Sequence, residues 1–489
     1  MVSVWCGAVY VTALFCIGGV KLRQSDAAKS NNEVRLLDHH KKMTEKPVSQ
    51  LVLRQAVPSI ISVLITTVYN MADTYFVSQL GTSAAGAVGV VFSLMAVFQA
   101  VGYTLGMGAG NVMSRQMGAM ETDKANCTAS TGVVTAFVIG LLFAIFGHIF
   151  IKNLMYLLGA TDTILPYAQA YGQYILLAAP FMCSSFVLST LLRCEGKSTL
   201  GTVGLTIGGL LNIGLDPLFI YTFDLGTAGA ALATAISQLV GFVILLAFFV
   251  LKKSNIHLSV KLVSRELKVY GNIVFTGFPS LSRQGLSSIA NLLLNRSAMI
   301  YGDAAIAAMG IVGKVFMFIF STVLGFLQGY QPIAGFNYGA KKYDRVKKAT
   351  YFAGSICIGA TVVIGAVCFL IAPEIISIFR RDDPDVIRIG ALALQMQCVV
   401  LPLCAVTTIS SFALQSTGQR VMAIILSMCR QGIFYIPLIL ILPNLFGLLG
   451  IQMTQTISDV LTLIVSVPFL IRFLKMLSWK EKETSGEDT

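Results

Sequence analysis

The chain of 489 residues is 55% hydrophobic and 12% charged, with a mean hydropathy of +0.77. These values exclude an ordinary soluble domain, in which about a quarter of the residues are charged. The net charge of +12 does not indicate nucleic-acid binding, because the basic residues lie in short loops between apolar runs. The ten cysteines lie mostly in or beside apolar runs without CxxC spacing, so we expect no cofactor, metal site or disulfide framework.

Residues 1–42 differ from the rest of the chain. Val2 to Val20 is apolar but short, and no basic residue precedes it as one would in a signal peptide. Residues 21–42 are polar and charged. An extra spanning helix is one interpretation. We favour the other, in which translation starts at Met43, the first spanning helix follows shortly after it, and residues 1–42 are a dispensable extension.

Apolar runs of roughly 20 residues follow from Leu51 onward, each long enough to cross a bilayer as a helix. Their unbroken length favours helices over the alternating strands of a barrel. The sequence therefore predicts an all-α polytopic membrane protein with twelve transmembrane helices. The predicted spans are 51–77, 86–110, 128–151, 165–192, 200–222, 228–251, 272–300, 306–335, 349–372, 389–415, 421–442 and 447–473.

Lysines and arginines concentrate in the links that follow spans 2, 4, 6 and 8 and in the C-terminal tail. The other links contain few basic residues, apart from one that mixes arginines with acids. By the positive-inside rule, both termini are expected to face the cytoplasm.

The two halves of the chain match at an offset of 221 residues without a gap. Chance agreement between apolar sequences favours Leu and Ala, whereas these matches are mainly Gly, Pro, Asn and Asp. They include Pro58 with Pro279, Asn70 with Asn291, Gly108 with Gly329, Gly118 with Gly339 and Asp123 with Asp344. The duplication predicts two repeated six-helix bundles, parallel because six is even, with a cavity between them for alternating access.

The predicted domains follow from the repeat and from the charge pattern. They are the extension (1–42), the N-terminal bundle (43–251), a basic cytoplasmic linker (252–271), the C-terminal bundle (272–475) and a polar cytoplasmic tail (476–489).

A carboxylate, Asp216, lies inside the apolar span 5, where an ionisable group costs about 2.5–3.5 kcal/mol. Asn212 is one helical turn earlier on the same face, and Pro217 follows directly. Thr234 of span 6 and Asp73 of span 1 are expected at a similar depth. These four polar residues predict a cation site, although Asp216 could alternatively cap a helix near the lipid headgroups.

The corresponding positions of the C-terminal half carry no acid. Asp73 aligns with Leu294, and Asp216 aligns with Pro437. We therefore expect the cation site in the N-terminal bundle alone. Pro58 either bends span 1 or stands at a favourable position near the start of the helix. The candidate residues for the lining of the cavity are Tyr69, Asn70, Gln284, Asn291 and Lys314.

The stretches NMADTYFVSQLG on span 1, NIGLDP on span 5 and GAALATAISQ on span 6 resemble those of the prokaryotic branch of the multidrug and toxic compound extrusion (MATE) family. The resemblance covers residues 44–475. It implies an antiporter that expels organic, often cationic, drugs in exchange for protons or sodium, with Asp73, Asn212, Asp216 and Thr234 as the cation site and Pro58 as the bend. Some members also carry an acid on span 7, where this chain reads SRQGLSS.

We therefore predict a cation-coupled drug antiporter in the bacterial cytoplasmic membrane, working as a monomer and not as an enzyme. Protons are favoured over sodium, because an apolar environment and a neighbouring acid both help a carboxylate to bind a proton. The alternative function is a flippase for lipid-linked saccharides, which would need basic residues in its cavity. Arg283 and Lys314 are the candidates for that role.

Overall fold

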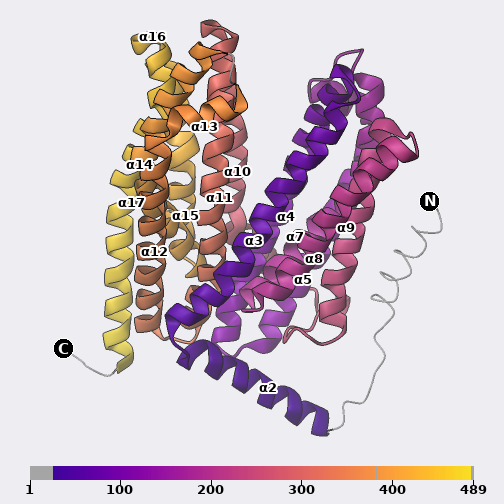
Figure 1. The fold of residues 1–489 in the computed structure, drawn as a ribbon. Helices are drawn as coiled ribbons and strands as arrows, with labels where there is room; N and C mark the ends of the chain where they lie inside the picture. Colours follow the sequence, from indigo (N-terminus) through magenta and orange to yellow (C-terminus); the bar gives the residue numbers. More distant parts are fainter. Residues whose placement is uncertain (1–25, 381–382, 486–489) are drawn as a thin grey trace.

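The computed structural model describes residues 26–380 and 383–485, without the side chains of some helical residues such as 26–32 and 70–75. Within these ranges the chain is almost entirely helical, and the helices form two bundles that stand side by side (Figure 1). This confirms the predicted all-α architecture of twelve long helices in two six-helix bundles.

The N-terminal bundle contains six long helices, of which the fifth changes from α- to π-helical geometry near its end. They are α3 (Val48–Ser78), α4 (Thr82–Gly118), α5 (Thr122–Ile149), α7 (Leu165–Cys194), α8 (Ser198–Pro217) with its π-helical continuation η1 (Leu218–Thr222), and α9 (Gly226–Val250).

The C-terminal bundle repeats this order, and its fifth helix is again interrupted by a π-helical turn. Its members are α10 (Leu267–Ala298), α11 (Asp303–Gly339), α12 (Tyr343–Leu370), α14 (Pro384–Ser416), α15 (Arg420–Met428) continued by η4 (Cys429–Ile433) and α16 (Tyr435–Phe446), and α17 (Leu448–Ser485). Thus α10 begins inside the predicted linker, and α17 continues into the predicted tail.

Eleven of the described helices are long and apolar enough to cross a membrane. The twelfth long helix of the bundles is α10, whose sequence is more polar because it contains Arg283, Gln284, Asn291 and Asn295. Its place in the C-terminal bundle matches that of α3 in the first, so the repeat and not its composition assigns it as a span.

Glycines that match between the halves form the same turns in both bundles. Gly81 before α4 and Gly302 before α11 have φ values of +114° and +89°. Gly226 and Gly447, next to α9 and α17, have φ values of +54° and +61°. These values are unfavourable for residues with a Cβ atom. The repeat therefore preserves the residues that its backbone turns require.

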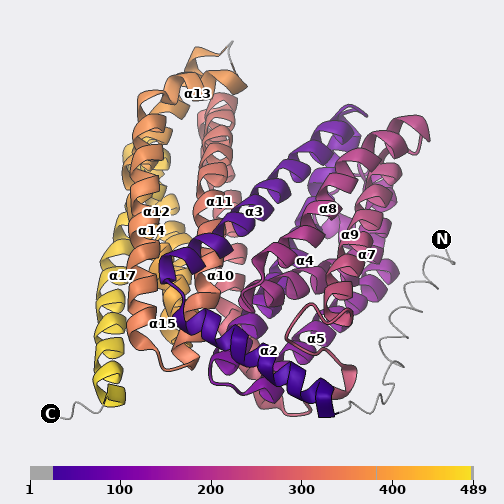
Figure 2. The same ribbon diagram turned by 60° about the horizontal axis from the view of Figure 1, so that its bottom comes forward.

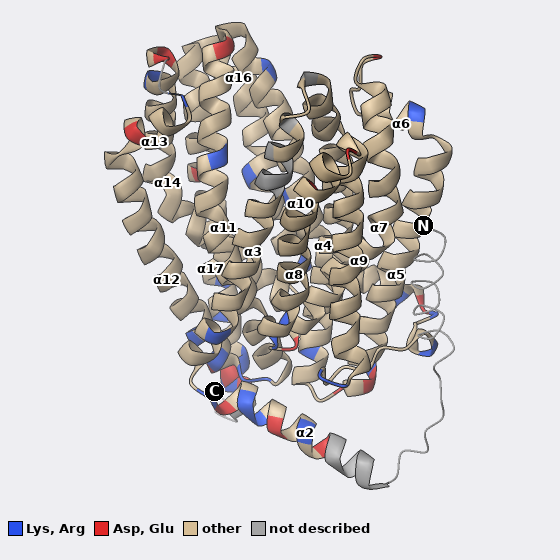
Figure 3. Ribbon diagram, turned by 45° about the vertical axis from the view of Figure 1, so that its right-hand side comes forward, with Lys and Arg blue, Asp and Glu red and all other residues tan. Residues whose placement is uncertain are grey.

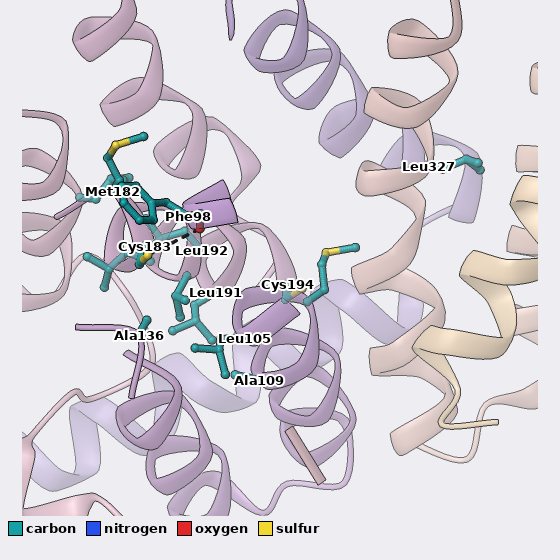
Figure 4. Packing of buried hydrophobic residues seen from close by; sticks show 14 of the residues in the cluster. Phe98, Leu105, Ala109, Ala136, Met182, Cys183, Leu191, Leu192, Cys194 and Leu327 are labelled. Carbon is teal, nitrogen blue, oxygen red and sulfur yellow. Dashed lines mark hydrogen bonds between the residues drawn. The ribbon is translucent and has the colours of Figure 1, made fainter. Parts of the chain in front are cut away.

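The core of the N-terminal bundle is built around α7, in which every residue from Ala178 to Cys194 is buried. Figure 4 shows side chains of α7, such as Cys183 and Leu191, among those of α4 and α5. Gly102 and Gly110 of α4 allow this helix to approach α7 closely, since a Cβ at either position would lie 2.9 or 2.7 Å from a side-chain atom of α7. Small residues commonly allow such close packing between membrane helices.

The two bundles meet through α3 with α11 and through α4 with α10, and they diverge toward the other end (Figures 1 and 2). At this seam, a Cβ on Gly108 would lie 2.0 Å from the carbonyl oxygen of Ile273, and a Cβ on Gly329 would lie 2.4 Å from the Cα of Ala56. Gly108 and Gly329 are equivalent in the repeat. Their partners across the seam are equivalent too, since Ala56 lies against Gly329 and Gly277 lies against Gly108. The bundles are thus joined by two pseudo-symmetric close contacts.

Side-chain hydrogen bonds also cross the seam. Ser114 Oγ donates to the carbonyl oxygen of Pro332 at 3.1 Å, and Arg115 Nη1 donates to that of Ser416 at 2.8 Å. Further along the seam, Arg193 Nη1 donates to Gln328 Oε1 at 2.5 Å. The seam is therefore sealed by backbone contact and by polar groups.

Lysines and arginines gather mainly at the end of the molecule where the bundles meet, which is also the end nearest the C-terminus (Figure 3). The helix α2 (Asp26–Glu45) lies across this end. His40 Nε2 lies 3.1 Å from the carbonyl oxygen of Gly118 in α4, and its ring packs on Phe336 of α11. Residues 26–42 thus touch both bundles, and the dispensability of residues 1–42 stays a prediction.

Candidate cation site

Three of the predicted site residues meet inside the N-terminal bundle. Asn212 Nδ2 donates to Asp216 Oδ1 at 3.1 Å within α8 and to Thr234 Oγ1 of α9 at 3.2 Å. The three residues are 2%, 0% and 3% exposed. The spacing of four residues places Asn212 and Asp216 on one face of α8, and the packing of α9 against α8 brings Thr234 to the same point.

The sequence of α8 explains why the site lies near the end of regular helix. Pro217 follows the acid directly and has no backbone N–H, and the chain continues from Leu218 as a π-helix to Thr222. Short π-helical turns within α-helices often occur at functional sites. Gly204 and Gly241 lie in contact where α8 and α9 cross, which brings the two helices together close to the polar residues.

A cavity adjoins this group, and its empty space amounts to about 450 Å³ when the open solvent at its mouth is counted. Its wall includes Asn212, Thr234 and Tyr69 of α3. The role of Tyr69 in a cavity between the bundles stays a prediction. Ser185 Oγ, Asn212 Oδ1 and Ser237 Oγ are buried on this wall and have no hydrogen-bond partner among the described residues. Buried oxygens that remain free can accept hydrogen bonds from water or coordinate a cation.

The other predicted residues of the N-terminal bundle are only partly described. The side chains of Asn70 and Asp73 lie outside the described residues, so their roles stay predictions. α3 remains helical through Pro58, and Thr202 Oγ1 of α8 donates to the carbonyl oxygen of Pro58 at 3.0 Å. This bond fixes α3 against α8 beside the proline, and the functional bend stays a prediction.

The remaining cavity candidates belong to the C-terminal bundle. Gln284 and Asn291 of α10 and Lys314 of α11 have exposed side chains, and they do not contribute to the wall of the N-terminal cavity. The structure does not bring them together with Asn212 and Asp216.

The C-terminal bundle contains a buried ion pair that sequence reasoning missed. Arg430 Nε donates to Asp459 Oδ1 at 2.7 Å, and the two side chains are 14% and 1% exposed. Ile433 and Pro437 occupy the repeat positions of Asn212 and Asp216, so the N-terminal group has no copy here. The signal in the sequence is that both charged residues fall inside predicted apolar spans, where an ionisable group is costly.

A family model described as MatE matches residues 58–218 and 279–441. The two ranges cover more than half of the chain, and the second begins 221 residues after the first, at the offset of the internal repeat. The chain belongs to the MatE family. As a member of this family it is a membrane transporter and not an enzyme.

Curated relatives share most of the chain. The multidrug export protein MepA of Staphylococcus saprophyticus is 28% identical over 424 residues, which cover 85% of this chain and 92% of the relative. MepA of Staphylococcus aureus strain MSSA476 is 26% identical over 434 residues, which cover 88% and 95%.

Solved structures share the fold. A MOP superfamily transporter from Pyrococcus furiosus, described as having a binding pocket of reversed polarity, matches with a TM-score of 0.83 at 25% identity, over 89% of this chain and 98% of that one. A multidrug resistance MATE family transporter in an outward-facing conformation matches with a TM-score of 0.83 at 24% identity, over 90% and 98%.

Proposed function

We propose that this MATE transporter, working as a monomer, exports organic cationic drugs in exchange for protons by alternating access between its two bundles. The observation that carries the proposal is a carboxylate, Asp216, buried in an apolar bundle and held by Asn212 beside a cavity with free oxygens. A charge at that depth is costly unless it binds something during the transport cycle.

The orientation of Asn212 favours protons over sodium as the coupling ion. Its amide nitrogen lies between the oxygens of Asp216 and Thr234. A sodium ion at this point would need oxygen ligands, so the amide would first have to rotate and present Oδ1. A proton needs one carboxylate and no such rotation, and sodium is the alternative ion.

The distribution of charge supports an assignment of the membrane sides. Lysines and arginines gather at the end where the bundles meet, which by the positive-inside rule is the cytoplasmic end (Figure 3). Both termini would then be cytoplasmic, and the bundles diverge toward the outside. This conformation corresponds to the outward-facing state for which one structural relative is described.

The contacts of the buried arginines favour drug export over the flipping of lipid-linked saccharides. A pyrophosphate group would need free cationic side chains. Arg193 is instead bonded to Thr190 and Gln328, and Arg430 is paired with Asp459. Of the two candidates named from the sequence, Arg283 stacks on Phe412 with its central carbon 5.0 Å from the ring centre, and Lys314 is exposed.

The test uses purified protein in proteoliposomes and a fluorescent organic cation. Transport is driven either by a proton gradient at equal sodium or by a sodium gradient at equal pH. We expect the proton gradient to drive transport and Asp216→Asn to abolish it with normal folding. The control is Asp224→Asn, an exposed acid in the link after α8 whose φ of +51° is tolerated by Asn.

Wild-type rates in Asp216→Asn would refute the assignment of the site. Transport that responds to sodium alone would leave the site standing and would replace the proton by sodium.

A further inference from the structure

The guanidinium group of Arg430 lies between an acid and two aromatic rings. Its central carbon is 4.7 Å from the ring centre of Phe320 and 5.3 Å from that of Phe316. The two rings are one turn apart on α11 and nearly parallel, with centres 5.7 Å apart and an interplanar angle of 18°. Their faces form one wall of a cage, and Asp459 forms the other.

The carboxylate of this cage is held in place by three helices. Asp459 Oδ1 accepts hydrogen bonds from Arg430 Nε at 2.7 Å and from Gln455 Nε2 at 3.0 Å. Asp459 Oδ2 accepts one from Cys404 Sγ of α14 at 3.1 Å. Arg430 Nη2 also donates to Cys404 Sγ at 3.7 Å, so the cysteine contacts both members of the pair. The bonds that Gln455 and Cys404 donate to Asp459 would keep the acid oriented if the guanidinium group moved away.

The backbone of Arg430 is fixed independently of its side chain. The residue lies in the π-helical turn η4, and Ser458 Oγ donates to its carbonyl oxygen at 2.6 Å. The arginine side chain is long and flexible, and that of Arg430 is 14% exposed. Phe316 is half-buried, and Phe320 is 8% exposed.

The internal repeat shows what occupies this place in the other bundle. At the offset of 221 residues, Arg430 corresponds to Gly209, Asp459 to Gln238 and Gln455 to Thr234. The three N-terminal counterparts all line the N-terminal cavity. A Cβ at Gly209 would lie 3.0 Å from a ring carbon of Tyr69, so the N-terminal bundle covers this position with an aromatic side chain where the C-terminal bundle has a guanidinium group.

Stability alone is a weak reason for such a pair. Buried ion pairs can often be replaced by apolar residues of similar volume with little loss of stability. In contrast, aromatic faces combined with a carboxylate are well suited to recognise an organic cation. A second arginine of this bundle, Arg283 of α10, likewise stacks on an aromatic ring, with its central carbon 5.0 Å from the ring centre of Phe412.

We propose that Asp459, Phe316 and Phe320 form a binding site for the exported organic cation, and that Arg430 occupies this site as a tethered guanidinium until the substrate displaces it. The proposal takes its substrate class from the proposed function. The site is separate from the coupling group at Asp216, and the exchange of one cation for another leaves Asp459 neutralised throughout.

A tethered competitor lowers the apparent affinity of the site, because only the molecules in which Arg430 has left can bind the substrate. Its removal should therefore tighten binding. The experiment measures the binding of tetraphenylphosphonium, an aromatic monovalent cation, by calorimetry on the full-length protein in lipid nanodiscs. No ion gradient is present, so the result does not depend on coupling.

We expect Arg430→Gly, which installs the residue found at position 209, to tighten binding about tenfold or more, since a competing occupied state is removed. Asp459→Asn should weaken binding about tenfold, because the charged partner is lost. The double variant Arg430→Gly/Asp459→Asn should lose the gain, and it contains no unpaired charge at this site. In Arg430→Gly, free guanidinium ion should compete with the probe.

Arg283→Gln is the matched control, because it removes a neighbouring positive charge without opening the cage. It should change the affinity less than about twofold, as for a partly screened charge. An equal gain in Arg283→Gln would show a general electrostatic effect and would overturn the proposal. If Arg430→Gly does not fold, Arg430→Gln replaces it with the same expectation.

Unchanged or weaker binding in the folded Arg430 variant, or unchanged binding in Asp459→Asn, would show that the pair is only structural. The same measurements in an Asp216→Asn background separate this proposal from the proposed function. A response to Arg430→Gly that persists in a transport-inactive background supports the second site even if the coupling assignment fails.

Discussion

A methyl group at Gly329 should disfavour the conformation in which the bundles meet through α3 and α11. A Cβ at this position would lie 2.4 Å from both the Cα and the backbone nitrogen of Ala56. A comfortable contact between carbon atoms is about 3.5–4.0 Å. Because the obstructing atoms belong to the backbone, no change of rotamer relieves the clash, and the two helices would have to separate by more than about 1 Å.

The cost can be compared with the effect of overpacking, which destabilises well-packed interiors by about 1–3 kcal/mol. A free-energy change of this size alters an equilibrium by roughly 5- to 150-fold. Gly329→Ala should therefore shift the protein by about that factor toward conformations in which this end is open. Gly108→Ala should act in the same direction, because its Cβ would lie 2.0 Å from the carbonyl oxygen of Ile273.

The assay measures the distance distribution between spin labels placed on the two bundles at the end rich in lysine and arginine. The transport rate of the organic cation is measured on the same variants. Gly310→Ala is the control on the same helix, since a Cβ there meets nothing within 4 Å. We expect longer distances and slower transport in Gly329→Ala and no change in Gly310→Ala. Wild-type distances in a folded Gly329→Ala protein would refute the reasoning.

Three further predictions concern the coupling group and the extension. Asn212→Ala and Thr234→Ala should each keep partial transport under a proton gradient, because neither side chain carries the proton. Complete loss of transport in both variants, together with wild-type activity that rises with added sodium, would contradict proton coupling. A protein that lacks residues 1–42 should still insert and confer drug tolerance, and failure in either assay would show that the extension is needed. Burial lowers the pKa of His39, although Glu195 opposes the shift, so docking of α2 should weaken as the pH falls below the ordinary histidine value of about 6.5. Hydrogen exchange of α2 at pH 5.5 and 7.5 measures this effect, which should disappear in His39→Leu.

The sequence predicted the number and order of the spans because eleven of them are long apolar runs and the repeat supports the twelfth, α10. It predicted the duplication because glycines and other residues recur at a fixed offset. It also placed Asn212 and Asp216 together, since four residues make one helical turn. Thr234 of α9 was predicted as a partner from its expected depth in the membrane. In the structure it accepts a hydrogen bond from Asn212 at 3.2 Å, as expected for residues at the same depth.

The ion pair of the C-terminal bundle could not be predicted in the same way. Arg430 and Asp459 lie on different helices, and their contact depends on which face each helix turns toward the other. The π-helical turn η4 changes that face at Arg430, and no local pattern in the sequence marks such a turn. Phe316 and Phe320 join the group from α11, more than a hundred residues away in the chain.

The comparison of the two halves distinguishes residues that form the contact between the bundles from polar residues in the interior of each bundle. Gly118 and Gly339 are identical in the repeat and make reciprocal contacts across the seam, since a Cβ on either would lie 2.0 Å from a carbonyl oxygen of the opposite bundle. Both bundles must close against each other at this end, so the same residue is required twice. The interior positions are under no such constraint, and Gly209 and Arg430 differ although they are equivalent. Identical glycines at the seam therefore mark the contact that both bundles make, and polar differences between the halves mark the interior positions at which we propose that each bundle binds its own ligand.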